Sequence, residues 1–257
     1  MKQFIVTSSA GKRLIGKALA QNIAVQNAAK NGTLVIIAGT TNGYIAEELF
    51  KTLNIAGFSR RHFFRGLTLP PAMQLSPEGR LVDESKFPGD VVITKGQWLR
   101  GKTIVEVADS LKEGDVIIKG ANALDLERRQ AAILIGHPKA GTIGVSLPVV
   151  VGRRIKLMIA VGLEKRVNGD LNSIAEKVNA PGADGYRLLP LSGQVFTEID
   201  AVTELTGASA ELIAAGGTCG AEGAVYLAVS GSKEQEEAAV KLFDEVAVEP
   251  PFDSSQL

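Results

Sequence analysis

The chain is poor in the residues that most often bind metals or form disulfides. It contains a single cysteine, Cys219, and only two histidines among 257 residues. An internal disulfide is therefore excluded, and a histidine-based metal site has no support. Lysine plus arginine and aspartate plus glutamate number 28 each, so no excess of positive charge suggests a nucleic-acid partner. We expect a protein that binds neither a metal nor nucleic acid.

Long apolar runs are also missing. The first ten residues hold too short an apolar run for a signal peptide. The most apolar stretch, residues 143–163, is interrupted by Pro148 and by charged side chains, which excludes a membrane span. A single cysteine suits a reducing compartment. The sequence therefore predicts a soluble, cytoplasmic protein that does not associate with membranes.

Strands alternate with helices through the first 185 residues. Hydrophobic residues make up 45% of the chain, which is typical of a globular α/β protein. Short apolar runs predict strands and longer amphipathic segments predict helices, and this alternation favours a mostly parallel sheet sandwiched by helices. The predicted strands are 33–38, 90–95, 116–118 and 154–161, and the predicted helices are 11–30 and 44–53. We therefore expect a Rossmann-like core domain over residues 1–185.

The pattern changes in the C-terminal part of the chain. It reads as strand, helix, two strands and helix, at residues 187–191, 197–205, 210–215, 224–229 and 232–246. This order is typical of a small ferredoxin-like α+β unit. We expect residues 186–257 to form such a subdomain, acting as a lid and ending in a polar tail.

A run of small residues, Gly39, Thr40, Thr41, Asn42 and Gly43, follows the first buried strand and precedes a helix. Backbone N–H groups and the positive end of the helix dipole can hold an anion at such a place, and threonine hydroxyls add donors. The run is neither a Walker A motif nor G-x-G-x-x-G, so we expect no nucleotide cofactor and no other cofactor. It predicts either a phosphate site or a plain turn.

A second candidate site begins with Lys119, at the end of the strand 116–118. Gly120 and Asn122 belong to a small-residue loop after it, and a helix is expected to begin near Asp125. Open α/β sheets bind their ligands beyond the carboxyl ends of the strands. The alternative is an ordinary turn with a solvated lysine.

With these segments laid out, the chain resembles ribose-5-phosphate isomerase A and the wider superfamily that includes CoA transferases and sugar-responsive regulators. The run 39–43 resembles the G-T-G-S-T loop of that family. The segment 106–109 lies thirteen residues ahead of Lys119 and resembles the family's D-G-A-D-E motif. Residues 119–127 resemble its K-G-G-G-x-A-L-x-R-E motif, one residue shorter, and Lys165 resembles the lysine of a later D-x-S-K pattern.

This resemblance implies an aldose–ketose isomerase that acts on a sugar phosphate such as ribose 5-phosphate. Glu127 would move the proton, Lys119 would stabilise the enediolate, and Asp109 and Glu106 would hold hydroxyls or assist ring opening. The substrate would lie on the 39–43 loop, with Gly120, Asn122 and Lys165 as further contacts. The broader interpretation, a protein that binds a phosphorylated small molecule of unassigned identity, comes first. A non-catalytic metabolite sensor and a CoA transferase are further alternatives.

Two other segments carry clustered cations. Arg60, Arg61 and Arg65 surround two phenylalanines, and Lys139 precedes the dipeptide Gly141-Thr142. The arginines could grip a phosphate, pair with acids at a subunit contact or form a solvated edge. Lys139 could help bind an anion or belong to a turn. The sequence leaves these roles and the formation of a homo-oligomer open.

Overall fold

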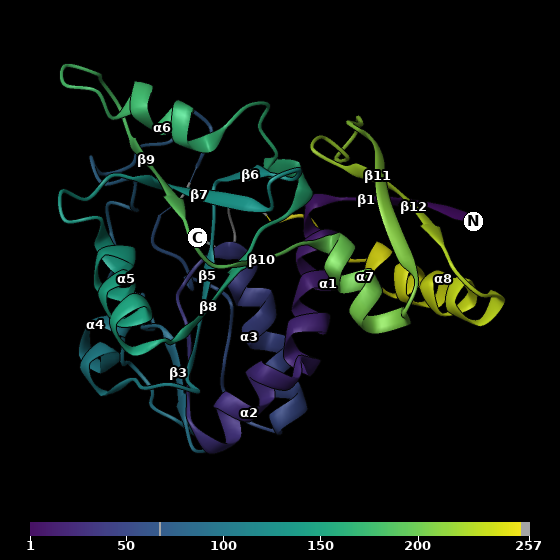
Figure 1. Ribbon diagram of the computed structural model, residues 1–257, viewed down its shortest axis with the longest axis horizontal. Helices are drawn as coiled ribbons and strands as arrows, with labels where there is room; N and C mark the ends of the chain where they lie inside the picture. The colour runs from purple at the N-terminus through teal and green to yellow at the C-terminus, as the bar shows by residue number, and fades with distance from the viewer. Residues whose placement is uncertain (67, 253–257) are drawn as a thin grey trace.

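The computed structural model describes residues 1–66 and 68–252. They form a mixed α/β protein with one six-stranded, mostly parallel sheet and two small antiparallel sheets (Figure 1). In the large sheet the strand order is β10-β8-β5-β2-β3-β4. The α/β class expected from the sequence is thus confirmed.

Four strands of the large sheet run parallel: β2 (Thr33–Ile36), β5 (Val116–Gly120), β8 (Lys156–Ala160) and β10 (Gln194–Phe196). At the other edge, β3 (Val91–Thr94) pairs antiparallel with β2 and with the short β4 (Gln97–Trp98). The central strands are rich in β-branched residues and are almost wholly buried, which suits a sheet covered on both faces. Their carboxyl ends meet at one edge of the sheet.

Helices cover the faces of this sheet, among them α1 (Ser8–Gln21), α2 (Ile23–Asn31), α3 (Thr40–Leu53), α5 (Gly141–Arg153) and the short α4 (Ile104–Val107). The single helix expected over residues 11–30 is two helices. Asn22 separates them because its side chain accepts hydrogen bonds from the N–H groups of Ala24 and Val25 and so caps α2. The Thr7 side chain caps α1 by accepting a hydrogen bond from the Ala10 N–H.

A second, antiparallel sheet contains β6 (Ala123–Asp125), β7 (Gln130–Ile135) and β9 (Arg187–Leu191). The prediction of a helix that begins near Asp125 was wrong, because β6 and β7 form a β-hairpin there. The Asp125 carboxylate accepts hydrogen bonds from the Arg128 N–H and guanidinium, 3.0 and 2.9 Å away, and so stabilises the turn. The sheet lies across the carboxyl ends of the large sheet, with α6 (Leu171–Val178) on its outer side (Figure 1).

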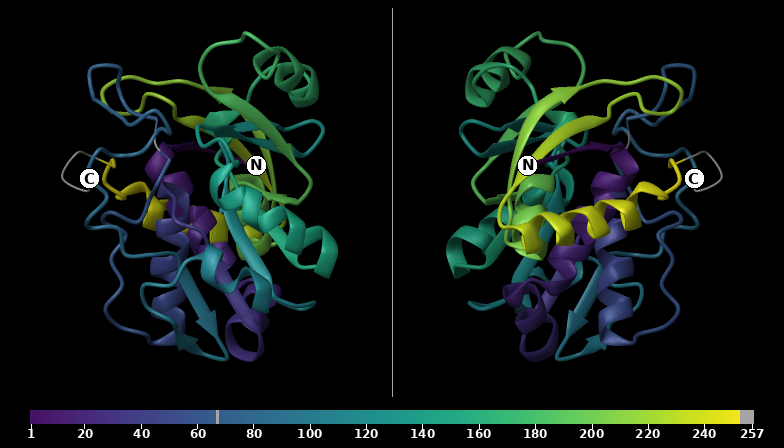
Figure 2. Two further views of the ribbon diagram at one scale, coloured as in Figure 1. Left: turned by 90° about the vertical axis from the view of Figure 1, so that its left-hand side faces the viewer. Right: turned by 90° about the vertical axis from the view of Figure 1, so that its right-hand side faces the viewer.

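The third sheet joins the two ends of the chain. β1 (Lys2–Val6) pairs with β12 (Val225–Ser230), which pairs with β11 (Ser209–Ala215). Helices α7 (Glu198–Thr206) and α8 (Lys233–Ala247) belong to this unit, and α8 lies across α1 (Figure 2). The expected strand at 187–191 exists, but as β9 it pairs with β7, while β10 joins the large sheet. The C-terminal sheet thus includes an N-terminal strand, β1. The predicted subdomain of residues 186–257 does not contain this strand.

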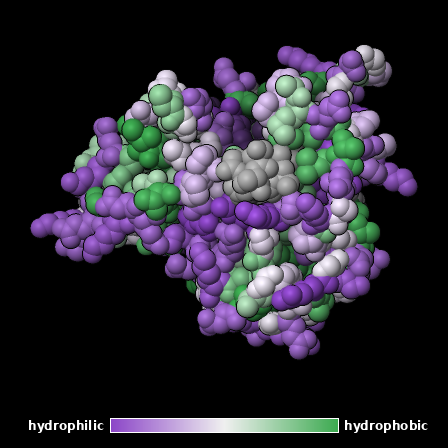
Figure 3. Space-filling model, turned by 180° about the vertical axis from the view of Figure 1, so that it is seen from behind, coloured by the Kyte–Doolittle hydropathy of each residue, from purple (hydrophilic) through white to green (hydrophobic). Residues whose placement is uncertain are grey.

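One face of the molecule is mainly polar. Hydrophilic side chains cover most of the face shown in Figure 3, with hydrophobic ones scattered among them. None of the described helices combines the length and the apolar character needed to cross a membrane.

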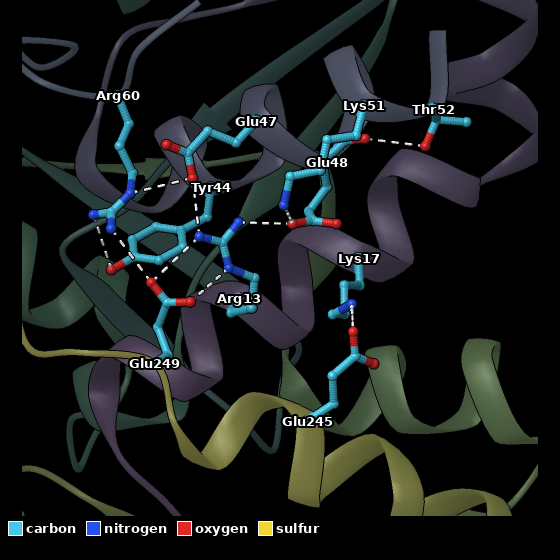
Figure 4. Close-up of polar contacts among 10 residues, drawn as sticks. All are labelled: Arg13, Lys17, Tyr44, Glu47, Glu48, Lys51, Thr52, Arg60, Glu245 and Glu249. Atoms are coloured by element: carbon cyan, nitrogen blue, oxygen red, sulfur yellow. Dashed lines mark hydrogen bonds and ion pairs between the residues drawn. The ribbon is translucent and has the colours of Figure 1, made fainter. Parts of the chain in front are cut away.

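An ion-pair network fixes α1, α3 and the C-terminal segment to one another (Figure 4). Arg13 of α1 binds Glu47 and Glu48 of α3 and also Glu249, with N–O distances of 2.8 to 2.9 Å. Arg60 joins the same network through Glu47 and Glu249. Both guanidinium groups lie over the ring of Tyr44, 4.7 and 4.4 Å from its centroid. Arg60, one of the clustered arginines, therefore has a structural role.

Candidate functional site

A cavity of about 170 Å³ lies between the large sheet and the β6–β7–β9 sheet. It opens where the parallel strands β2 and β5 end, as in other open α/β sheets. Its walls are the ends of β2, β5 and β7, the starts of α3 and α5, and loop residues; they comprise 37–42, 119–122, 133–137, 140–143, Arg65, Gly66, Thr68, 78–80, Asp90, Lys165 and Tyr186.

The start of α3 forms one wall of the cavity. Gly39 precedes the helix in an extended conformation, and no side chain caps the helix. The first intrahelical hydrogen bond runs from the Gly43 N–H to the Gly39 carbonyl, so the N–H groups of residues 40–42 have no partner within the helix. A Cβ atom at Gly39 would meet nothing within 4 Å, so a ligand can approach this backbone closely.

Two buried side chains at this helix start have unused hydrogen-bonding groups. Thr41 and Asn42 are 2% and 1% exposed, and both line the cavity. The Thr41 hydroxyl and the Asn42 Oδ1 have no hydrogen-bond partner among the described residues. Buried polar atoms are almost always hydrogen-bonded in native proteins, so these two atoms are available to a molecule that enters the cavity. The hydroxyl can donate to an anion, and Oδ1 can accept from a ligand hydroxyl.

The start of α5 forms a second wall. Ala140, in a left-handed conformation with φ 58°, precedes the helix, and again no side chain caps it. Each of the six other α-helices in the described part of the chain begins at a polar side chain that caps it or forms a capping box. The two uncapped helix starts thus face the same cavity. Because the dipole of each helix places partial positive charge there, the cavity favours anions.

Four cationic side chains strengthen this positive field, and two acidic ones oppose it. Lys119, Lys165, Arg65 and Arg80 line the cavity together with Asp90 and Glu78. Lys165 Nζ donates to the Ala121 carbonyl at 2.9 Å, which fixes its position. The Arg65 guanidinium lies 4.2 Å from the centroid of the Phe87 ring, and its Nε has no hydrogen-bond partner among the described residues. The balance of side-chain charge is positive.

Lys119 and Asp90 both line the cavity and lie close enough for their charges to interact. Asp90 is 2% exposed, and its carboxylate accepts from the Ala38 and Ile104 N–H groups at 2.9 and 2.8 Å. Burial raises the pKa of Asp90. Burial, assisted by the charge of Lys165, lowers the pKa of Lys119 to about 8, although the charge of Asp90 opposes this shift. The side-chain amine of Lys119 makes no hydrogen bond or ion pair with the described residues.

Most of the expected ligand contacts line this cavity, whereas the three expected acids do not. Gly39, Thr40, Thr41, Asn42, Lys119, Gly120, Asn122 and Lys165 all line it. Gly43 does not, because it is buried within α3 against Arg60, where a Cβ would lie 2.9 Å from the Arg60 Cβ.

The three acids are found on the surface. Glu127 is exposed in the turn of the β6–β7 hairpin, which carries it away from Lys119. Asp109 is fully exposed beside Arg153. Glu106 is bound to Lys102 and forms the capping box of α4 with Thr103. The structure therefore does not bring a carboxylate from the isomerase motifs to the lysine.

The sequence did not indicate that Asp90, Arg80 and the start of α5 lie together at one cavity. They come from distant segments, and only the Lys139-to-Thr142 turn carried a local signal. No protein-family model, curated protein or solved structure matches this chain in comparisons with known proteins. Within the described residues, no group of three or more histidine, cysteine, aspartate or glutamate side chains could hold a metal ion.

Proposed function

We propose that the protein binds a small phosphorylated metabolite in this cavity, with the phosphate at the start of α3. The observation that carries the proposal is the pairing of an uncapped helix start with the unpartnered, buried Thr41 hydroxyl beside it. Three backbone N–H groups and this hydroxyl can surround a tetrahedral anion.

The surrounding charge supports a dianion rather than a neutral ligand. Lys119 has no anionic hydrogen-bond partner among the described residues, and burial disfavours its charged form. A phosphate beside it offsets that cost because the attraction between opposite charges is strong where water is scarce. Arg65, which also lines the cavity, adds a further donor through its Nε, which has no partner among the described residues.

The place of the cavity in the fold bears on the fold family and on catalysis. A ligand site beyond the carboxyl ends of β2 and β5 supports a Rossmann-like core and a relation to the ribose-5-phosphate isomerase superfamily. The surface positions of Glu127, Asp109 and Glu106 favour binding without isomerisation. A metabolite sensor is therefore the form of the proposal that the geometry favours.

Calorimetric titration with ribose 5-phosphate, ribose, inorganic phosphate and a short acyl-CoA tests the proposal. We expect ribose 5-phosphate and phosphate to bind, and ribose to bind much more weakly or not at all. Thr40→Ala removes a hydroxyl from the cavity wall and should weaken phosphate binding severalfold. Thr52→Ala is the matched control, because Thr52 lies at the far end of the same helix and bonds only to the Glu48 carbonyl.

The same samples distinguish an isomerase from a metabolite sensor. Formation of ribulose 5-phosphate that is lost in Glu127→Gln would favour the isomerase over the sensor. Equal affinity for ribose and ribose 5-phosphate, or no response to phosphate at all, would refute phosphate recognition.

A further inference from the structure

The two lysines of the cavity differ in what their amines contact. Lys165 Nζ is held by the Ala121 carbonyl at 2.9 Å. The side-chain amine of Lys119, at the end of β5, has no hydrogen bond or ion pair within the described residues, although the residue is partly buried. The amine of Lys165 is thus held in place by a carbonyl, and the amine of Lys119 is available for reaction with a ligand.

Lys119 also lies next to the proposed phosphate position. The Asn42 Nδ2 donates to the carbonyl of Ile118, the residue before Lys119, at 3.3 Å. The Ile37 N–H donates to the same carbonyl at 3.0 Å. These bonds join the end of β5 to the start of α3, so a ligand whose phosphate lies on residues 40–42 has its next few atoms within reach of Lys119.

We propose that Lys119 is a nucleophile that forms an imine with a carbonyl group of the bound ligand. The ligand class is then the phosphorylated aldehydes and ketones. The inference rests on the proposed function, because the phosphate site is what delivers the carbonyl to the amine.

The step balances without an oxidant or a reductant. The neutral amine attacks the carbonyl carbon, a C–N bond forms, and the π electron pair moves to oxygen. Nitrogen then gives up two protons, oxygen receives both, and the C–O bond breaks to release water. A lysine that is desolvated and lies beside a second cation is well suited to this chemistry, because a larger share of its amine is neutral. Burial and the charge of Lys165 provide both conditions, and the pKa of Lys119 is lowered accordingly.

Reductive trapping tests this inference. The full-length protein is incubated at pH 7.5 with glycolaldehyde phosphate and sodium cyanoborohydride, and peptide mass spectrometry locates the adduct. We expect labelling of Lys119 at least about tenfold faster than of other lysines. Excess inorganic phosphate should suppress the labelling of Lys119. Unphosphorylated glycolaldehyde should label Lys119 no faster than the other lysines.

Three variants make the result specific. Lys119→Met should abolish the fast adduct. Lys119→Arg keeps the positive charge but has no nucleophilic amine, so it should give no adduct, and a cooperative urea-unfolding transition would show that this variant is folded. Lys156→Met, at the opposite end of the sheet, should be labelled like the wild-type protein.

Adducts that are spread evenly over surface lysines, or that form on Lys165, would overturn the inference. If calorimetry shows phosphate binding and Lys119 stays unlabelled, the imine alone is refuted. If phosphate does not bind, the proposed function is refuted, and the inference that rests on it is refuted as well.

Discussion

The side-chain amide of Asn42 donates to the carbonyl of Ile118 at 3.3 Å and joins the start of α3 to the end of β5. It also donates to the Ile37 carbonyl at 2.7 Å, so a single buried side chain fixes three segments around the cavity. This arrangement places the uncapped N–H groups of the helix beside Lys119.

Replacement of Asn42 by alanine should therefore damage both stability and binding. Two buried hydrogen bonds are lost, and we expect the free energy of unfolding to fall by about 1–3 kcal/mol. Phosphate affinity should fall with it, because the helix start loses its anchor. Urea unfolding and calorimetry measure the two effects. Asn27→Ala, an exposed position on α2, is the control and should change neither; equal effects of the two substitutions would contradict the anchoring role.

Anion affinity should depend on the protonation of Lys119. Its pKa is lowered to about 8, so the lysine is cationic below this pH and loses its charge above it. Sulfate is the useful probe because its own charge is constant in this range. We expect sulfate affinity to be steady below pH 7 and to fall roughly tenfold, about 1.4 kcal/mol, as the pH rises through 8.

The charged groups that face Lys119 are Asp90 and Lys165, and the pKa of Lys165 is lowered as well. Lys119→Met isolates the contribution of Lys119. This variant should bind sulfate more weakly and show a smaller change with pH. An unchanged profile in the variant would assign the dependence to Lys165 instead.

Glu198 should make the protein less stable as the pH rises. The carboxyl group is 2% exposed, and burial together with the charge of Glu164 raises its pKa to about 8. Because the folded-state pKa lies above the unfolded value, the stabilisation is complete below about pH 4.5 and is lost as the pH rises through 8.

Glu198→Gln should remove this loss, since the amide oxygen can still accept from the Leu163 N–H. At pH 9 the variant should be more stable than wild type by roughly 1–3 kcal/mol, and the gap should narrow towards pH 5. Urea unfolding across this pH range provides the measurement, with the exposed Glu211→Gln as control. A gap that is constant with pH would contradict the titration of Glu198.

The packing of α1 on α3 should not tolerate a methyl group at Gly16. Alanine normally favours a helix over glycine by up to about 1 kcal/mol. A Cβ at Gly16, however, would lie 2.9 Å from the Tyr44 carbonyl oxygen, and backbone cannot move aside cheaply. We expect Gly16→Ala to destabilise by about 1–3 kcal/mol. Gly152→Ala in α5, where a Cβ would meet nothing within 4 Å, should be neutral or stabilising in the same thermal unfolding assay.

The sequence predicts features that depend on neighbouring residues. The β-branched run at 116–118 predicts a buried strand, and the small residues at 39–42 predict a backbone that a ligand can approach, because both properties are local. The hairpin at 123–135 was missed because the pairing of β7 with the distant β9 favours a strand there. The pairing of β1 with β12, between the two ends of the chain, has no local signal either.

The same distinction applies to the site. Lys119 and residues 39–42 stand out in the sequence because each follows a predicted strand. Asp90 joins them only through its bonds to Ala38 and Ile104, which depend on the folded chain. The motif that contains Glu127 resembled a catalytic segment, but the conformation of its backbone carries the glutamate to the surface.

Phosphate titration monitored by the backbone amide resonances tests the phosphate site at the start of α3. We predict that the amides of Thr40, Thr41 and Asn42 shift together and saturate with one dissociation constant. The amides at the start of α8 provide an internal control, because the Ser232 side chain already accepts from the Gln235 N–H there. Shifts confined to other helix starts, with residues 40–42 unchanged at saturating phosphate, would contradict this prediction.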